Sequence, residues 1–287
     1  QSRARQSMTI LTAYDFLKDW TPKKPLDHPA LKTGFRVIDE RIAGLRPGNI
    51  YIVAGRPSMG VSTALRSITI NVLRQGANVL CCTSGRPIEP EVVRLLSNIT
   101  GRVDVDDIEW NTLNDEQRSL LDRAKTELSD YYLSFSREKS FSALLEDCKT
   151  FLSNNHSKLP LIVIDNPIFL DAENSSDESI GRSLSKLAYD HQVPIVLAAG
   201  ALPRADRKTL HESRLADIKG AFDILDFADA ILFLRREEVY NLDTEDRGVV
   251  EIKIVKNNGR LTGSCQKSIF FESTSKVQDR EVFEDNR

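Results

Sequence analysis

Short apolar runs alternate with amphipathic stretches along most of this 287-residue chain. The apolar runs are bounded by turn residues and are too short for buried helices, so we expect strands. These expected strands are Ile50–Ala54, Val79–Thr83, Tyr132–Phe135, Leu161–Ile164, Pro194–Ala198 and Ala230–Leu234. Helical spacing of apolar residues predicts helices at Ser62–Gln75, Glu89–Thr100, Asn114–Ser129, Phe141–Asn154 and Ser176–His191. Strand–helix alternation needs crossover connections, so the pattern predicts an α/β domain with a mostly parallel central sheet flanked by helices.

The pattern changes towards the C-terminus. Gly248–Val255 and Ser268–Glu272 have strand character with no helical stretch between them, which predicts antiparallel strands at the C-terminal edge of the sheet. Ser273–Arg287 is polar, and we expect a frayed tail there. The expected organisation is an N-terminal arm over residues 1–30, one domain over residues 31–272 and a polar tail over residues 273–287.

The arm contains a short amphipathic pattern. Apolar residues within Ile10–Trp20 recur at helical spacing, and Thr12-x-x-Asp15 resembles a capping box with Asp in place of Glu. A proline-rich linker follows over Thr21–Pro29. An apolar helix on such a tether has two interpretations: it docks on another protein, or it folds back on its own domain.

Net charge, the spacing of cysteine and histidine, and the length of the apolar runs limit the classes of function that this chain can have. A net charge of −3 excludes a bulk polycation, so any contact with nucleic acid must come from a local basic patch. The four cysteines show no C-x-x-C spacing, and the four histidines are scattered without a metal-ligand pattern. No apolar run approaches membrane-spanning length. We therefore expect a reduced, cytoplasmic protein, with association with the nucleoid as one option.

Candidate chemistry concentrates between the first expected strand and the first long expected helix. Gly55-x-x-x-x-Gly60 has the form of a phosphate-binding loop, in which backbone N–H groups and a helix N-terminus surround phosphates. The expected nucleotide-binding residues are Gly55, Arg56, Ser58, Gly60, Ser62 and Thr63. The full motif requires Lys before Ser/Thr to neutralise phosphate charge, and that position is Val61. Ser62 remains a candidate Mg²⁺ ligand.

Several stretches together resemble the C-terminal, RecA-like ATPase domain of DnaB-type replicative helicases. They are Thr33-Gly-Phe-x-x-x-Asp39, Ala43-Gly-Leu-x-Pro-Gly48, Arg56-Pro-Ser-Met-Gly60, Leu161-Ile-Val-Ile-Asp165, Val193-Pro-Ile-Val196 and the segment from Ala228 to Tyr240. The similarity runs from about Thr33 to Glu272. It implies a RecA-like P-loop fold, ATP and Mg²⁺ as cofactors, a hexameric ring and DNA unwinding.

The resemblance weakens at the positions that carry the family's chemistry. Val61 stands at the P-loop lysine, Gly85 at the water-activating glutamate and Ala201 at the γ-phosphate-sensing glutamine. Asn258 stands at the arginine finger that reaches a neighbouring subunit, although Arg260 is an alternative if the alignment shifts.

Asp165, at the end of the family's Walker B strand, is the candidate partner of Ser62 in holding Mg²⁺. The alternative for this aspartate is a cap on the following turn. The candidate DNA-binding residues are Arg204, Arg207, Lys208, Arg214 and Lys219. The alternative for them is a solvated loop of mixed charge.

The leading hypothesis is a degenerate DnaB-like protein of DNA replication or repair. It would be a pseudo-ATPase that binds nucleotide weakly or not at all and acts through protein or DNA binding. The arm Ile10–Trp20 matches the linker helix of such helicases in position, so it suggests self-association or insertion into a replicative helicase ring. One alternative is an active ATP-dependent helicase whose catalytic charges are relocated to Arg56, Arg86, Glu89 or Glu91. The other is a non-motor ring that binds single-stranded DNA.

Overall fold

The computed structural model describes residues 30–154, 159–165, 179–201, 218, 222–263 and 265–279, together with the single positions 13 and 17. Most of the arm Ile10–Trp20 and all of the candidate DNA-binding residues lie outside these ranges. Within them, no helix is both long and apolar enough to cross a membrane.

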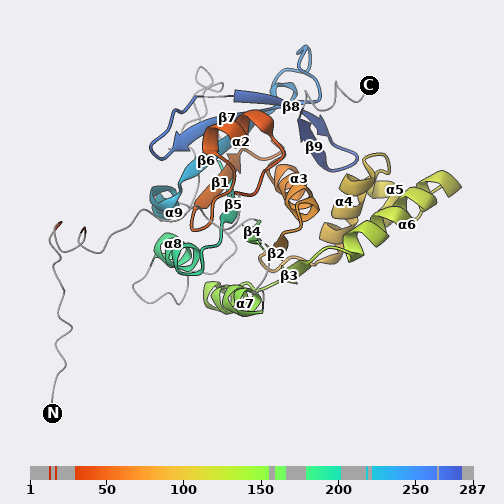
Figure 1. The fold of residues 1–287 in the computed structure, drawn as a ribbon. Helices are drawn as coiled ribbons and strands as arrows, with labels where there is room; N and C mark the ends of the chain where they lie inside the picture. The colour runs from red at the N-terminus through yellow and green to blue at the C-terminus, as the bar shows by residue number, and fades with distance from the viewer. Residues whose placement is uncertain are drawn as a thin grey trace.

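The described chain forms one sheet of nine strands in the order β3-β2-β4-β5-β1-β6-β7-β8-β9 (Figure 1). The strands are β1 Ile50–Gly55, β2 Asn78–Cys82, β3 Leu133–Ser136, β4 Pro160–Ile164, β5 Ile195–Gly200, β6 Ala230–Arg235, β7 Val249–Asn257, β8 Cys265–Phe271 and β9 Lys276–Asp279. Strands β1 to β6 pair in parallel, and the pairs from β6 to β9 are antiparallel. The predicted mostly parallel sheet with antiparallel strands at its C-terminal edge is confirmed.

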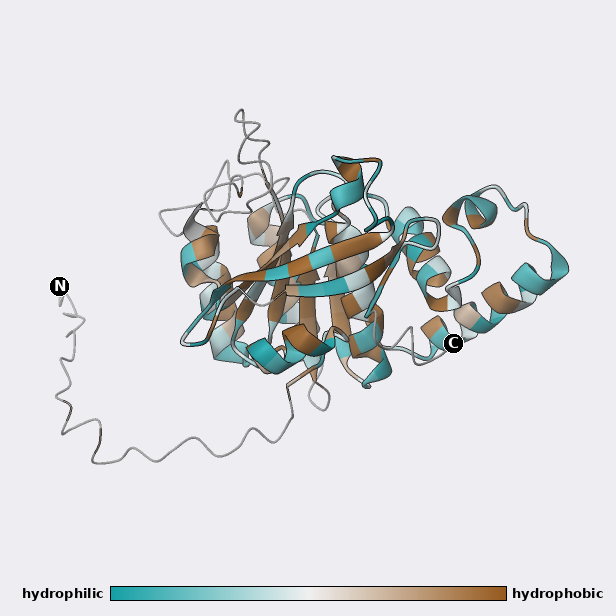
Figure 2. Cartoon of the chain, turned by 90° about the horizontal axis from the view of Figure 1, so that it is seen from above, coloured by the Kyte–Doolittle hydropathy of each residue, from teal (hydrophilic) through white to brown (hydrophobic). Residues whose placement is uncertain are grey.

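Helices cover both faces of this sheet (Figure 1). They are α2 Arg36–Ile42, α3 Val61–Arg74, α4 Glu89–Thr100, α5 Val105–Glu109, α6 Asp115–Ser129, α7 Phe141–Ser153, α8 Ile180–His191 and α9 Phe222–Phe227, with a 3₁₀ turn η4 at Glu237–Val239. Residues of α2 and α3 share a core with one face of the strands, and residues of α7, α8 and α9 share a core with the other. Figure 2 shows hydrophobic residues concentrated in the central strands, while the helices alternate hydrophobic and hydrophilic residues.

Strand β1 lies between β5 and β6, and all of its residues are buried. Successive side chains of a strand point to opposite faces, so Val53 packs in the core beneath α3 while Ile52 packs in the core beneath α8. At the carboxyl end of the strand, Gly55 pairs with Gly200. This places the loop after β1 beside the end of β5, where ligands bind in open α/β sheets.

The family-like stretch from Thr33 to Asp39 forms a turn closed by a carboxylate. Asp39 Oδ1 accepts hydrogen bonds from the Thr33 N–H at 2.8 Å and the Thr33 hydroxyl at 2.9 Å, and Oδ2 accepts one from the Gly34 N–H at 3.1 Å. Burial raises the pKa of Asp39 above its ordinary value, against the opposing effect of these hydrogen bonds. The motif is therefore structural: it fixes the entry into α2.

The sheet extends beyond residue 272, where we expected the polar tail to begin. Strand β9 pairs antiparallel with β8, and Val277 is buried beneath α3. The Asp279 carboxylate accepts a hydrogen bond from the Arg36 N–H at 2.8 Å, which joins β9 to the start of α2. A strand this short, with one buried apolar residue among polar neighbours, gives little pattern in the sequence.

Candidate nucleotide-binding site

The loop between β1 and α3 has the backbone of an anion cradle. Ser58 and Gly60 both have positive φ, at 67° and 86°. Helix α3 has no side-chain cap at its N-terminus and no acidic residue in its first turn. Its first N–H groups have no partner within the helix, and the helix dipole places partial positive charge there. The loop and the helix start therefore present donors and no negative charge to a ligand.

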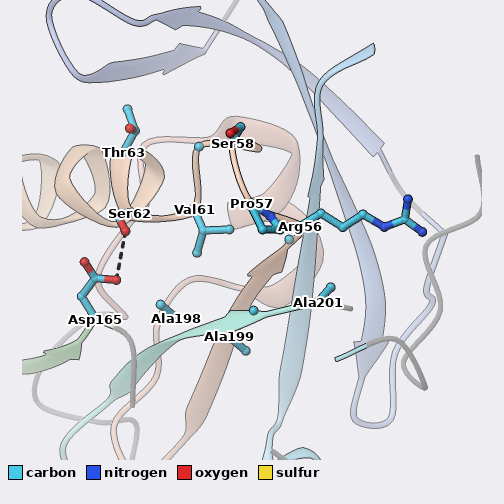
Figure 3. Close-up of a pocket in the computed structure, with 13 residues that line it drawn as sticks. Arg56, Pro57, Ser58, Val61, Ser62, Thr63, Asp165, Ala198, Ala199 and Ala201 are labelled. Atoms are coloured by element: carbon cyan, nitrogen blue, oxygen red, sulfur yellow. Dashed lines mark hydrogen bonds between the residues drawn. The ribbon is translucent and has the colours of Figure 1, made fainter. Parts of the chain in front are cut away.

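A cavity of about 480 Å³ opens at this loop. Its lining includes every residue predicted to contact the nucleotide: Gly55, Arg56, Ser58, Gly60, Ser62 and Thr63. Asp165, from the end of β4, and Ala198 to Ala201, from β5 and the residue after it, complete the wall with Pro57 and Val61 (Figure 3). The structure thus brings the predicted cradle and the predicted metal ligand into one cavity.

Val61 occupies the position where the family's motif has lysine, and it behaves as a packing residue. Its side chain is half-buried against the core of α2 and α3. A Cβ on Gly55 would lie 2.9 Å from Val61 Cγ2, so valine fills the space directly above that glycine. The lining of this cavity, in the part of the chain that the structure describes, contains no lysine.

Arg56 does not place its charge in the cradle. Its side chain extends away from Ser62 and Asp165 (Figure 3). The guanidinium lies 5.9 Å from the centre of the Tyr240 ring, and Nη1 is 3.4 Å from the Tyr240 hydroxyl. In this conformation Arg56 does not substitute for the missing lysine.

Asp165 is held by groups from two neighbouring elements. The Ser62 hydroxyl donates to Oδ1 at 3.0 Å, and Arg86 Nη2 pairs with Oδ2 at 2.5 Å. The Arg86 Nε also donates to the Thr83 carbonyl at 3.2 Å, which fixes the side chain after β2. Ser84 donates to the Asp165 backbone carbonyl at 3.1 Å. Sequence reasoning placed Arg86 near the phosphates but missed its pairing with Asp165.

Gly85, the predicted position of the water-activating glutamate, lies beside the side chain of Lys139. Gly85 has a φ of 83°, and a Cβ built there would lie 2.5 Å from Lys139 Cγ. The Lys139 stem therefore covers the place from which a glutamate would project. Of the proposed substitute bases, Glu89 is exposed, and Glu91 forms a two-pronged ion pair with Arg66 at 2.9 and 2.8 Å.

The other two predicted family positions, Ala201 and Asn258, and Lys256 near Asn258 make hydrogen bonds within the scaffold. Ala201 is buried, and its N–H donates to the Gly55 carbonyl at 2.9 Å. The Asn258 N–H donates to the Asp229 carbonyl at 2.8 Å. Lys256 Nζ donates to the Leu225 carbonyl at 2.7 Å, near the end of α9. Neither Lys256 nor Asn258 lines the cavity of its own chain.

A buried arginine supports the loop from behind, and sequence reasoning did not find it. Arg236 Nη1 donates to the Ser58 carbonyl at 3.1 Å, and the guanidinium lies 3.7 Å from the centre of the Phe270 ring. Phe270 in turn packs on Gly60, where a Cβ would meet its ring at 2.5 Å. Burial opposes ionisation of Glu238, but hydrogen bonds from the Gly248 N–H and Arg236 outweigh it and lower the Glu238 pKa. The loop shape is thus fixed by β8 and by the segment after β6.

These features define a class: a RecA-like α/β domain with a phosphate-binding loop at the end of its central strand. The sequence profile of the DnaB-like helicase C terminal domain matches residues 30–279. The chain belongs to this family.

Named relatives and solved structures agree with that assignment. The chain is 29% identical over 252 residues to the replicative DNA helicase DnaB of Pasteurella multocida (strain Pm70), covering 80% of this chain and 52% of the relative. It is 30% identical over 250 residues to DnaB of Haemophilus influenzae, covering 80% and 51%. The chain thus spans about half the length of these curated relatives.

Two solved structures share the fold. One, described as an ATPase domain, superposes with a TM-score of 0.80 at 19% identity, covering 87% of this chain and 91% of that one. The other, a DnaB-like replicative helicase described with its interactions with primase, gives a TM-score of 0.78 at 20% identity, covering 87% and 61%.

The family resemblance implies two cofactors, ATP and Mg²⁺, and the site fits the first better than the second. The cradle suits a phosphate group, because it offers a free helix start and left-handed loop residues. At the predicted metal position, Arg86 pairs with one carboxylate oxygen of Asp165, so a divalent ion there would compete with a cation that is already present.

Proposed function

We propose that this chain is a DnaB-like domain of DNA replication that acts by binding and has lost ATP turnover. The observation that carries the proposal is Gly85, which offers no carboxylate as a base and has a left-handed backbone with the Lys139 stem beside it. Loss of a positioned general base costs about 10²–10⁴ in rate. The packed Val61 removes the charge-assisted contact that the motif's lysine makes with phosphate.

The proposed partners follow from the family. Its named members are replicative DNA helicases, and one structural neighbour is described with its interactions with primase. We propose that this domain associates with its own copies or with a replicative helicase ring through the arm Ile10–Trp20. Single-stranded DNA, contacted by the basic loop from Arg204 to Lys219, is a further proposed ligand. ATP binding is proposed to be weak, and the proposed location is the cytoplasm.

Phosphate release from ATP tests the proposal. The full chain is assayed with and without single-stranded DNA, beside Asp165→Ala. We expect both proteins to release phosphate at the rate of buffer alone. DNA-stimulated release that is abolished in Asp165→Ala would refute the loss of turnover.

A second candidate is an ATP-driven translocase with relocated charge. Arg86 favours it, because it places a cation beside Asp165, which lines the cavity. This candidate requires phosphate release that is stimulated by DNA and lost in Arg86→Met, so the same assay with that variant separates the two functions.

A further inference from the structure

Asp165, the aspartate predicted to hold a metal ion, already has a positively charged partner in this protein, because Arg86 forms an ion pair with it. The Asp165 side chain is only 13% exposed, and Arg86 Nη2 lies 2.5 Å from its Oδ2. The Ser62 hydroxyl, which the P-loop pattern assigns to the metal, donates to Oδ1. The Arg86 side chain is 41% exposed. A divalent ion at this place would have to displace the guanidinium or bind beside it against like charge.

Arg86 is held in this arrangement by more than the ion pair. Its Nε donates to the Thr83 carbonyl at 3.2 Å, and the Arg86 N–H donates to the same carbonyl at 3.2 Å. Thr83 Oγ1 donates back to the Arg86 carbonyl at 2.8 Å. The turn after β2 therefore aims the guanidinium at the end of β4, and the parallel pairing of β2 with β4 sets the distance.

This arrangement changes what the cradle can bind. In a P-loop with a free aspartate, the carboxylate repels phosphate unless a metal ion lies between them. Here the aspartate already has its counter-ion, and the start of α3 carries no acidic side chain. A phosphate group in the cradle therefore meets partial positive charge and a neutral ion pair, with no need for a metal ion.

We infer that Arg86 replaces the divalent cation, and that this cavity takes the polyphosphate group of its ligand without Mg²⁺. The ligand class is a nucleoside triphosphate or an inorganic polyphosphate, which present the same oxygen atoms to the cradle. The inference rests on the proposed function in one respect: a site without a metal ion and without a base binds but does not hydrolyse.

The test is a fluorescence titration of the full chain with a non-hydrolysable MANT-labelled ATP analogue, in excess MgCl₂ or in excess EDTA. Unlabelled tripolyphosphate as competitor separates the two ligand sources: an inhibition constant equal to that of unlabelled ATP places recognition in the phosphates alone. For the wild type we expect an affinity in EDTA equal to or greater than that in MgCl₂. For Arg86→Met, which frees Asp165, we expect binding to become metal-dependent by about tenfold or more.

Two further variants keep the test sharp. Arg123→Met removes an exposed arginine on α6 and should behave like the wild type. Asp165→Asn keeps Arg86 but removes its partner, so its affinity should not fall in MgCl₂ or in EDTA, whereas a magnesium site would lose affinity in MgCl₂. Asp165→Asn also carries the test if Arg86→Met does not fold.

Two results would overturn the inference: wild-type binding that needs Mg²⁺ by about tenfold or more, or no binding of either ligand in either buffer. Metal-dependent binding without phosphate release would sink this inference alone. Phosphate release together with metal-independent binding would instead sink the proposed function alone.

Discussion

Gly85→Ala is the most direct perturbation of the turn after β2, because it adds one carbon at the predicted position of the family's glutamate. Two costs arise from the structure. A non-glycine residue in the left-handed region, here at φ 83°, costs about 1–2 kcal/mol. The new Cβ would also lie 2.5 Å from Lys139 Cγ, and moving that side chain off its rotamer costs up to about 1 kcal/mol more.

Two controls separate these costs. Gly76 has a φ of 82° and open space around a built Cβ, so Gly76→Ala measures the backbone cost alone. Adding Lys139→Ala to Gly85→Ala should remove the steric part and leave a loss close to that of Gly76→Ala. Urea unfolding followed by circular dichroism gives the free energies, with unchanged slopes as the check on two-state behaviour.

The predicted cost of a side chain at residue 85 is refuted if Gly85→Ala leaves the free energy of unfolding unchanged. That result would mean that the turn after β2 does not hold the conformation described here, and that a glutamate at this position could be accommodated. A loss in Gly85→Ala that Lys139→Ala does not relieve would refute only the steric part.

Three other changes test different parts of the account. Val61→Lys should raise affinity for the MANT-labelled ATP analogue by about tenfold or more, because it restores a charge-assisted contact; an equal gain in Val61→Leu would contradict this. Glu91→Ala leaves Arg66 buried without its ion-pair partner, so it should lower the free energy of unfolding in urea by about 3 kcal/mol or more. Glu127→Ala, which breaks the more exposed pair with Arg74, should lower it by less than about 1 kcal/mol. Burial raises the pKa of Asp39 above 3.8, so the folded state favours the protonated form, and this contribution to stability is lost as the pH rises from 3.8 through the raised pKa. Urea unfolding at stepped pH should show that decline in the wild type and not in Asp39→Asn; parallel profiles would refute it.

Elements with a strong period were predictable from the sequence. Helix α4 runs over Glu89–Thr100 as predicted, because its apolar residues repeat at helical spacing and Gly101 ends it in the left-handed conformation. The buried strands were recognisable as apolar runs. Short elements such as α2, α5 and β9 were not predicted, because their positions depend on contacts with distant segments.

The candidate site divides in the same way. The cradle was predicted because its residues are contiguous in the sequence. The pairing of Arg86 with Asp165 spans 79 positions and depends on β2 and β4 being neighbours, which periodicity does not specify. The side chain beside Gly85 is that of Lys139, in the segment between β3 and α7. No pattern in the sequence near Gly85 predicts this contact.

Single-turnover hydrolysis measures the proposed loss of ATP turnover in this chain. The full chain, in excess over γ-labelled ATP, is incubated with single-stranded DNA and MgCl₂, and the labelled phosphate is followed over hours. The account predicts release no faster than in buffer, with Val61→Lys raising binding but not release. Release above the buffer rate that disappears in Asp165→Ala would contradict it.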